Sequence, residues 1–577
     1  MLGNLVGCLL LYASWMGFAF RVEQKSGIDI HFAPALVMTA QLLAVFLAGL
    51  LNLMNICVWL LFLLGLYLFA QGIYTRRADF FKAFSGVGFL FFALFSVVLF
   101  AAMYGKEISG YDDFSHWALI VKQMLEDGRY PNFENMIIFQ SYPPGSASFI
   151  FYVATIVGTG EHIWLFAQNL LGLACILPVF AFFRGGNRAF ALVYAMALAN
   201  LLMMFNIPAH SLLVDSILPL LGGMCILLVY HITRELRCGT EKTVLWCIPP
   251  LAAVILVKNS GILFAAVPVL LLLRHERHHI SKAVVAVSVS PWLVLPLWQK
   301  HCDMVFSQPE FSKHSMSAEY FLEIFSQKPP EFVAWLARRM VIFSVSGKEL
   351  YLVLALMAAS GILVCVLSGK HLDKVKKLFL FCAVLYLVYE LGLLLMYIFS
   401  MPADEAYRLA GAERYRRSIL MVFIYLTAVC TLSAMSDMEL NAKKKSLSAA
   451  AILLLLGFWR LDAGGFTHIF QGESHPARDG IEQILREYDV PEGSSCFMCA
   501  APNIYAGAEI HICQYLLESE KVWMSYEADE AELERMCGEY DYLLFLDEEN
   551  TLARAWADEN YPDQKGRAAV DLRKTDK

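Results

Sequence analysis

Long apolar runs separated by short polar segments are the feature that most limits how this chain can fold. A helix needs about 20 apolar residues to cross the hydrocarbon core of a bilayer. Of the 577 residues, 58% are hydrophobic and 17% are charged, which is typical of a multi-span membrane protein. We predict about fourteen spans, roughly at residues 2–20, 32–51, 55–74, 83–104, 162–183, 189–205, 211–231, 243–257, 260–273, 282–299, 349–368, 378–400, 418–436 and 447–462.

These runs predict an all-α polytopic membrane protein, and the composition changes only in the tail. The tail is charged, and its short apolar segments predict strands at 495–498, 522–525 and 542–546, with helices at 481–488 and 530–536. That alternation indicates a small α/β domain. The predicted domains are extra N-terminal helices (1–82), a transmembrane core (83–464) with a polar loop at 105–145, and the α/β domain (465–577).

Two features of the chain argue against other classes. The first apolar run lacks a basic segment before it and a small-residue cleavage site after it, so we expect a retained span and not a signal peptide. The net charge of −7 argues against a nucleic-acid partner.

Basic residues in the short loops set the predicted orientation, because positive charge favours the cytoplasmic side. The basic loops lie at 76–82, 184–188, 234–242, 274–282, 370–377 and 443–445. All of these loops lie on the same side of the membrane if the short apolar run 146–157 does not cross it. The loops at 105–145 and 302–330 and the whole tail then lie outside. No Asn-x-Ser/Thr sequence is present, which favours the plasma membrane of a bacterium.

One loop breaks this charge pattern. Residues 401–417 are expected outside, yet they include four arginines: Arg408, Arg414, Arg416 and Arg417. Arginine presents a planar fork that suits phosphate oxygens, so an anion site is one interpretation. The other is a solvated helix end neutralised by Glu405 and Glu413.

The loop at 105–145 opens with two adjacent acids, Asp112 and Asp113, at the start of a predicted amphipathic helix. Its apolar residues follow helical spacing: Trp117, Ile120, Val121, Met124 and Leu125. Either acid could cap this surface helix, and Gly128 could end it.

A carboxylate at a helix N-terminus is held ionised and can accept a proton from a hydroxyl. His116 can share the face of the acids, where it could orient a carboxylate, bind phosphate or help to hold a divalent cation. Helix capping alone is the simpler alternative.

The same loop carries a resemblance to a known family. Its segments DD (112–113), WALI (117–120), MLEDGRYP (124–131) and YPP (142–144) resemble the first external loop of the GT-C glycosyltransferases. Those enzymes, such as the protein O-mannosyltransferases and the lipid A aminoarabinose transferases, use polyprenyl-phosphate sugars. The resemblance implies Asp112 as the general base, with Asp113 and His116 in support.

Two further segments and one departure bear on donor binding. The pair Arg414-Tyr415 resembles the Arg-Tyr that opens a late span in this family, and the turn from Lys258 to Gly261 resembles its Lys-x-x-Gly turn. Tyr142 stands where the family has a lysine before two prolines. In place of that lysine, the donor phosphate would be bound by Lys258 or by the group Arg408, Arg414, Tyr415 and Arg417. Tyr142 would lie beside the substrate.

The resemblance implies a membrane glycosyltransferase that takes a sugar from a polyprenyl-phosphate donor on the outer face. The acceptor would be a glycan, lipid or protein of the cell envelope, in contact with membrane lipid. A flippase or transporter of lipid-linked saccharides and an O-antigen-type ligase or polymerase are the alternatives. No cofactor is implied for certain, and a divalent cation stays open.

The cysteines of the tail are a separate candidate site. Cys496 and Cys499 form a C-x-x-C, with Cys513 and Cys537 beyond. No clean second pair follows, so packing or a disulfide is favoured over a zinc site.

Overall fold

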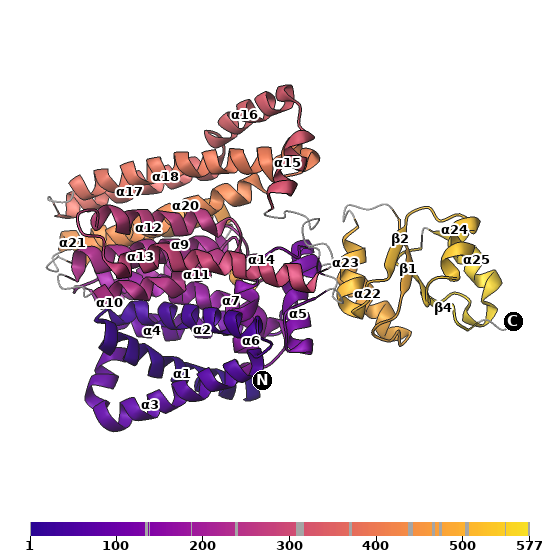
Figure 1. Cartoon of the computed structure of the whole chain (residues 1–577), viewed down its shortest axis with the longest axis horizontal. Coiled ribbons are helices and arrows are strands. Elements are labelled where there is room, and N and C mark those ends of the chain that lie inside the picture. Colours follow the sequence, from indigo (N-terminus) through magenta and orange to yellow (C-terminus); the bar gives the residue numbers. More distant parts are fainter. Residues whose placement is uncertain are drawn as a thin grey trace. The chain divides into compact units, whose positions relative to one another are not determined.

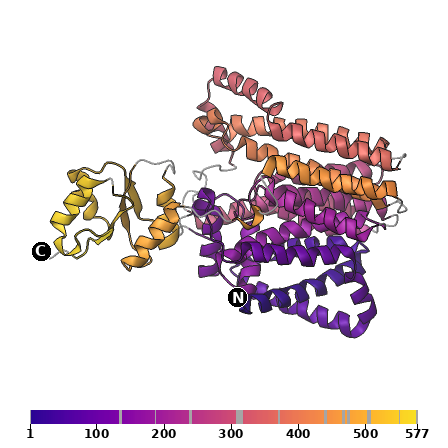
Figure 2. The same cartoon turned by 180° about the vertical axis from the view of Figure 1, so that it is seen from behind.

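The computed structural model describes residues 2–132, 137, 139–185, 187–236, 241–306, 317–368, 372–436, 442–463, 468–471, 476–501, 507–548 and 550–574. The chain forms two compact units (Figures 1 and 2). The first unit comprises Met1–Lys106, Met124–Tyr130 and Phe139–Gln471. The second comprises Glu107–Gln123, Pro131–Ile138 and Gly472–Lys577, so it joins a loop of the N-terminal half to the tail.

The first unit is built from helices. They are α1 (Leu2–Ser26), α2 (Ala33–Gly49), α3 (Met54–Phe84), α4 (Val87–Met103), α6 (Gly145–Val157), α7 (Glu161–Ile176), α8 (Arg188–Met204), α9 (Ile217–Tyr230), α10 (Glu241–Val244), α11 (Ile248–Val257), α12 (Gly261–His275), α13 (Lys282–Val289), α14 (Val294–Val305), α15 (Ala318–Ser326), α16 (Pro330–Ser344), α17 (Lys348–Ser368), α18 (Leu372–Phe399), α19 (Ala403–Arg408), α20 (Ala412–Ser436) and α21 (Ala442–Ala463).

The predicted polytopic fold class is confirmed. Among the described residues, nine helices are long and apolar enough to cross a membrane, and each of them covers a predicted span. Four of the other five predicted spans form apolar helical segments of 15–17 residues, and the fifth lies in α21, a helix of 22 residues. At 1.5 Å per residue the four shorter segments reach roughly 23–26 Å, which is somewhat less than the hydrocarbon thickness of about 30 Å.

The helices differ in how much of their surface faces other helices. The apolar windows of the spans Ile217–Arg234 and Ala412–Met435 are 83% and 89% buried within the protein, whereas that of Leu372–Phe399 is 22% buried. Helices α9 and α20 are therefore central, and α18 presents most of its surface outward. Helix α9 packs against α12 and α20, and these three helices run alongside one another in Figure 1.

The second unit contains the predicted α/β fold. Its described strands are β1 (Cys496–Cys499), β2 (Val522–Ser525), β3 (Tyr542–Phe545) and β4 (Ala569–Asp571), in the order β2-β1-β3-β4. Strand β1 pairs in parallel with β2 and β3, and β4 is antiparallel to β3. Its helices are α22 (Pro476–Glu487), α23 (Ala508–Leu517), α24 (Glu530–Cys537) and α25 (Thr551–Asn560).

The three predicted strands of this unit form at their predicted places, within one residue. Strands β1 and β3 are buried along their whole length, as expected for short apolar runs in the middle of a sheet. Phe497, Leu533, Leu543 and Trp556 join the core between the sheet and its helices. The sequence did not indicate α23, α25 or β4.

Candidate functional site

A tight backbone reversal connects α19 to α20 in the segment 401–417, which carries four arginines. Leu409 and Gly411 both take positive φ, at 53° and 75°. Helix α20 then begins at Ala412, so its first backbone N–H groups and the positive end of its dipole lie at this reversal.

An open cavity of about 710 Å³ lies at this reversal, and arginines line it. The four arginines are Arg339 from α16, Arg408 from α19, and Arg414 and Arg417 from α20. Among the described lining residues Glu413 is the one acid. The lining therefore carries an excess of positive charge, and guanidinium groups bind phosphate oxygens with charge-assisted hydrogen bonds. We call this space the arginine cavity.

The arginines of the segment do not act as one cluster. Arg414 and Arg417 are three residues apart on α20 and share a face, whereas Arg416 points elsewhere. The guanidinium of Arg416 pairs with Glu349, donates to the carbonyls of Phe343 and Ser346, and is 2% exposed. Arg416 is therefore a structural residue of the helix bundle.

Arg408 and Arg417 have further contacts within the first unit. Arg408 forms an exposed pair with Asp404 at 3.1 Å. Arg417 donates to the carbonyl of Phe205 at 2.6 Å, directly after α8 ends. That bond ties the start of α20 to the end of α8 and holds one wall of the arginine cavity.

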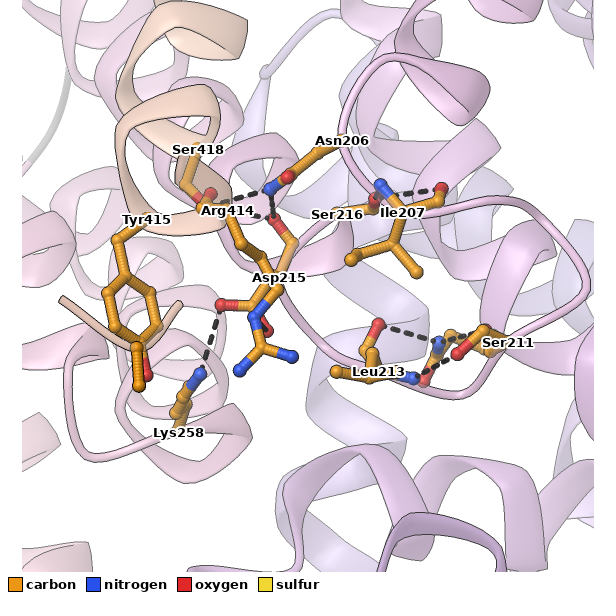
Figure 3. A network of polar contacts seen from close by, with 12 residues as sticks. Asn206, Ile207, Ser211, Leu213, Asp215, Ser216, Lys258, Arg414, Tyr415 and Ser418 are labelled. Atoms are coloured by element: carbon orange, nitrogen blue, oxygen red, sulfur yellow. Dashed lines mark hydrogen bonds and ion pairs between the residues drawn. The ribbon is translucent and has the colours of Figure 1, made fainter. Parts of the chain in front are cut away.

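Arg414 also belongs to a buried polar network centred on Asp215, shown in Figure 3. The Nζ atom of Lys258 lies 2.9 Å from Oδ1 of Asp215, and Nε of Arg414 lies 3.4 Å from Oδ2. Asn206 donates to the backbone carbonyl of Asp215 and to the hydroxyl of Ser418. The Asp215 side chain is 2% exposed, so the two cations compensate for the cost of burying its charge.

Lys258 reaches this network because of the short turn between α11 and α12. The N–H of Gly261 donates to the carbonyl of Lys258 at 2.8 Å, and a Cβ at Gly261 would collide with the backbone carbonyl of Val254. Only glycine lets the two helices approach this closely. The Tyr415 ring lies 4.9 Å from Nζ of Lys258 and 5.6 Å from the Arg414 guanidinium. Three of the predicted donor-binding residues, Lys258, Arg414 and Tyr415, therefore meet in one place.

The predicted catalytic residues lie in the second unit. Asp112 precedes η2 (Asp113–Trp117), a single π-helical turn that continues into α5 (Ala118–Asp127). Asp112 occupies the N-cap position with helical φ and ψ of −65° and −22°, and its side chain makes no capping hydrogen bond. The predicted cap at Asp112 is therefore wrong, because a capping side chain needs an extended backbone at that position. The predicted end of the helix is confirmed: Gly128 follows α5 with φ of +66°.

The three predicted catalytic side chains differ in exposure. Asp112 is half-buried, whereas Asp113 and His116 are buried. Burial lowers the pKa of His116 to about 3, so its imidazole is neutral at physiological pH. A neutral imidazole can donate or accept one hydrogen bond but cannot supply a positive charge to a phosphate.

The tail of the chain packs against this acid-bearing segment within the second unit. Nη1 of Arg478, on α22, donates to the carbonyl of Ile108 at 2.7 Å. Nζ of Lys122 donates to the carbonyl of Tyr515 at the end of α23 at 2.8 Å, and it pairs with Glu518 at 2.7 Å. Helices α22 and α23 therefore hold both ends of the segment 107–123.

Tyr142 lies in the first unit and contacts Phe139. Its ring stacks on Phe139 at 5.0 Å, and its N–H donates to the Phe139 carbonyl. The predicted role of Tyr142 beside the substrate stays a prediction.

Sequence reasoning missed Asp215 and Arg339. Asp215 is an acid inside a predicted apolar span, and an ionisable residue at such a place is itself a signal of function. Arg339 gives no such signal, because only the packing of α16 brings it to the cavity. Its guanidinium donates to the carbonyl of Tyr407 and lies over the Trp335 ring.

The cysteines of the tail pack in the core of the second unit. Cys496 and Cys499 lie on β1, and Cys513 lies on α23; all three are buried. Cys496 and Cys513 are free thiols. The Cys537 side chain lies outside the described residues. Among the residues that are described, no three His, Cys, Asp or Glu side chains are placed to hold a metal ion.

Two crystal structures of ArnT from Cupriavidus metallidurans are similar to this chain. The apo structure aligns over 79% of this chain and 92% of ArnT, with 14% identity and a TM-score of 0.37. The structure bound to undecaprenyl phosphate aligns over 76% of this chain and 86% of ArnT, with 15% identity and a TM-score of 0.32. No protein-family model and no curated protein matches the chain. Similarity at this level identifies neither a substrate nor a site residue.

Proposed function

We propose that this protein is a membrane glycosyltransferase that moves a sugar from a polyprenyl-phosphate donor to a cell-envelope acceptor. The reaction would take place on the extracytoplasmic face of the plasma membrane of a bacterium. The acceptor class is a hydroxyl-bearing glycan, lipid or protein. The tail domain lies on the same face in this proposal.

The observation that carries the proposal is the arginine cavity at one end of the central helices. The positive-inside rule disfavours a concentration of arginines on the outer face, so an anionic ligand would account for four arginines around one cavity there. A phosphate held at a membrane surface is such a ligand, and the start of α20 adds the positive end of a helix dipole. In this proposal Arg339, Arg414 and Arg417 bind the donor phosphate, with Arg408 at the rim.

Lys258 and Tyr415 take part in the same donor site in this proposal. Lys258 and Arg414 share the Asp215 carboxylate, which fixes the two cations close to each other before any ligand arrives. Such preorganised positive charge stabilises the charge that develops on a leaving phosphate without further reorganisation.

Asp112 is the proposed general base. Its half-buried side chain is open to an acceptor hydroxyl, whereas Asp113 and His116 are buried and would position it. The acceptor oxygen forms a bond to the anomeric carbon as the bond from that carbon to the phosphate oxygen breaks. The hydroxyl proton passes to Asp112, and polyprenyl phosphate leaves with its negative charge held by the arginines.

The test measures transfer of radiolabelled sugar from polyprenyl-phosphate sugars in membranes that contain wild type or a variant at matched expression. Asp112→Asn should lower kcat by about a hundredfold or more, because general-base catalysis contributes about that much. Arg339→Gln should raise KM for the donor about tenfold, which is the loss expected for one hydrogen bond to a charged group.

Arg338→Gln is the matched control for the cavity. Arg338 neighbours Arg339 on α16 and is exposed, but it does not line the cavity. The KM of the Arg338→Gln variant for the donor should therefore equal that of wild type. Equal effects of the two substitutions would refute donor binding in the arginine cavity. If no variant and no wild type transfers sugar while lipid-linked sugar still crosses the membrane, the protein is a flippase and the proposal fails.

A further inference from the structure

A second basic region lies at the other ends of the helices that form the arginine cavity. An apolar cavity of about 350 Å³ opens between α9, α12, α17, α18 and α20. A second cavity of about 460 Å³ adjoins it at the ends of α9 and α12. Tyr230 and Leu271 line both cavities, so the two are neighbours, and together we call them the amphiphilic pocket.

The amphiphilic pocket separates its apolar and charged surfaces. Its interior is lined by aliphatic and aromatic side chains such as Ile226, Leu227 and Phe381. Its mouth is lined by five permanently basic side chains: Arg234, Arg274, Arg277, Lys374 and Lys377. Among the described residues that line it there is no Asp or Glu. The combination suits a ligand with a hydrocarbon chain and an anionic headgroup.

The amphiphilic pocket and the arginine cavity lie at opposite ends of the same helices. Helix α20 begins at the arginine cavity, and Ser433 and Ala434, near its end, line the amphiphilic pocket. Helix α9 likewise begins beside Asp215 and ends at Tyr230. The spans Ile217–Arg234 and Ala412–Met435 are long and apolar enough to cross a membrane, so the two spaces face opposite leaflets.

We propose that the amphiphilic pocket binds an anionic phospholipid of the leaflet opposite the arginine cavity. One acyl chain would enter the apolar interior, and the phosphate headgroup would pair with the lysines and arginines at the mouth. The basic residues could serve only to orient the protein in the membrane, for which it is enough that they lie in loops. Here, however, they also border a cavity with an apolar interior, and membrane orientation does not require such a cavity. A phospholipid fits better than the polyprenyl-phosphate donor, because anionic phospholipids are abundant in the cytoplasmic leaflet, where the positive-inside rule places this end.

This proposal does not rest on the transferase activity. It requires only an anionic headgroup, an apolar chain and a pocket that faces the membrane. The phospholipid would brace α9, α12 and α18 against one another at the end of the bundle where short loops connect them.

The experiment measures binding of phosphatidylglycerol to the purified full-length chain by native mass spectrometry. Lys374 and Lys377 are three residues apart and share a face of α18, so both reach the mouth. Lys374→Gln/Lys377→Gln should weaken binding about 30-fold, because each basic residue near a lipid headgroup contributes about a factor of five. Arg274→Gln/Arg277→Gln should weaken it to a similar extent and provides a second, independent variant.

Lys376→Gln is the matched control, since Lys376 is exposed on the same turn of α18 but does not line the pocket. Its phosphatidylglycerol affinity should equal that of wild type. Equal affinity in all variants, or an equal loss in Lys376→Gln, would overturn the site. If polyprenyl phosphate displaces phosphatidylglycerol at equal concentration from wild type, the phospholipid assignment is wrong.

Discussion

At the scale of single residues, Asp215 organises the candidate donor site. Its carboxylate is buried and lies within ion-pair distance of both Lys258 and Arg414. Two cations close together repel each other, so without this acid neither would stay in place unless an anion were bound. Asp215 therefore sets the geometry that a phosphate would meet.

Asp215→Asn should lower the free energy of unfolding by about 3 kcal/mol, because removing one partner of a buried ion pair leaves the other charges uncompensated. The measurement is chemical denaturation of the purified protein in mixed micelles. Asp404→Asn is the control: Asp404 pairs with Arg408, both side chains are 70% exposed, and such pairs contribute about 0.5 kcal/mol or less. If the two substitutions cost the same, Asp215 does not have the structural role described.

At the scale of elements, the turn between α11 and α12 determines where Lys258 lies. Lys258 is the residue directly after α11, and Gly261 is the first residue of α12. The close approach at Gly261 keeps the turn short, so the lysine cannot move away from Asp215 without separating the two helices.

Gly261→Ala should destabilise the protein by about 2 kcal/mol, since the added methyl group overpacks the contact with the Val254 carbonyl. Sugar transfer should fall as well, because Lys258 is displaced. Thermal unfolding and the transfer assay measure the two effects. A Cβ at Gly457 in α21 would meet nothing within 4 Å, so Gly457→Ala should be neutral or slightly stabilising. Equal stability of both variants would show that α11 and α12 can move apart at this turn without cost.

At the scale of the whole molecule, the chain joins two distant segments into one folded unit. The acid-bearing segment 107–123 belongs with the tail domain and not with the helices that flank it in sequence. Arg478 carries much of this link: it donates to the Ile108 carbonyl, pairs with Glu482 at 2.8 Å and lies near the Phe114 ring. We therefore expect the tail domain to position the segment that carries Asp112.

Arg478→Gln should loosen the segment 107–123 and lower sugar transfer about tenfold or more, because small misplacement of a catalytic group has large effects on rate. Limited proteolysis should cleave this segment faster than in wild type. Arg486→Gln is the control on the same helix, since Arg486 is exposed and pairs only with Glu482 among the described ion pairs. Wild-type proteolysis and transfer in Arg478→Gln would refute the positioning role of the tail.

Much of the fold was predictable because it depends on local properties. Long apolar runs predicted the apolar helices of the first unit, though not α15, α16 or α19, and short apolar segments predicted β1, β2 and β3. Helix α23 escaped prediction because it mixes polar and apolar residues without a clear period. Helix α25 does bury Ala553, Trp556 and Ala557 at helical spacing, a signal that sequence reasoning missed. For the candidate site, the excess of arginines at 401–417 left two interpretations open, an anion site or a solvated helix end. Only the structure shows that Arg416 pairs with Glu349 and does not line the cavity with Arg414 and Arg417.

The sequence by itself determined the membrane class, the α/β tail and the acid-led loop, since hydrophobicity and charge are read residue by residue. The orientation in the membrane stays a prediction of the positive-inside rule. Only the tertiary structure decided which charges meet. Lys258 and Asp215 are 43 residues apart in the chain, and Arg478 and Ile108 are 370 apart. Ion pairs and hydrogen bonds act over a few ångströms, so they depend on how helices pack and not on spacing along the chain. The arginine cavity and the amphiphilic pocket exist for the same reason.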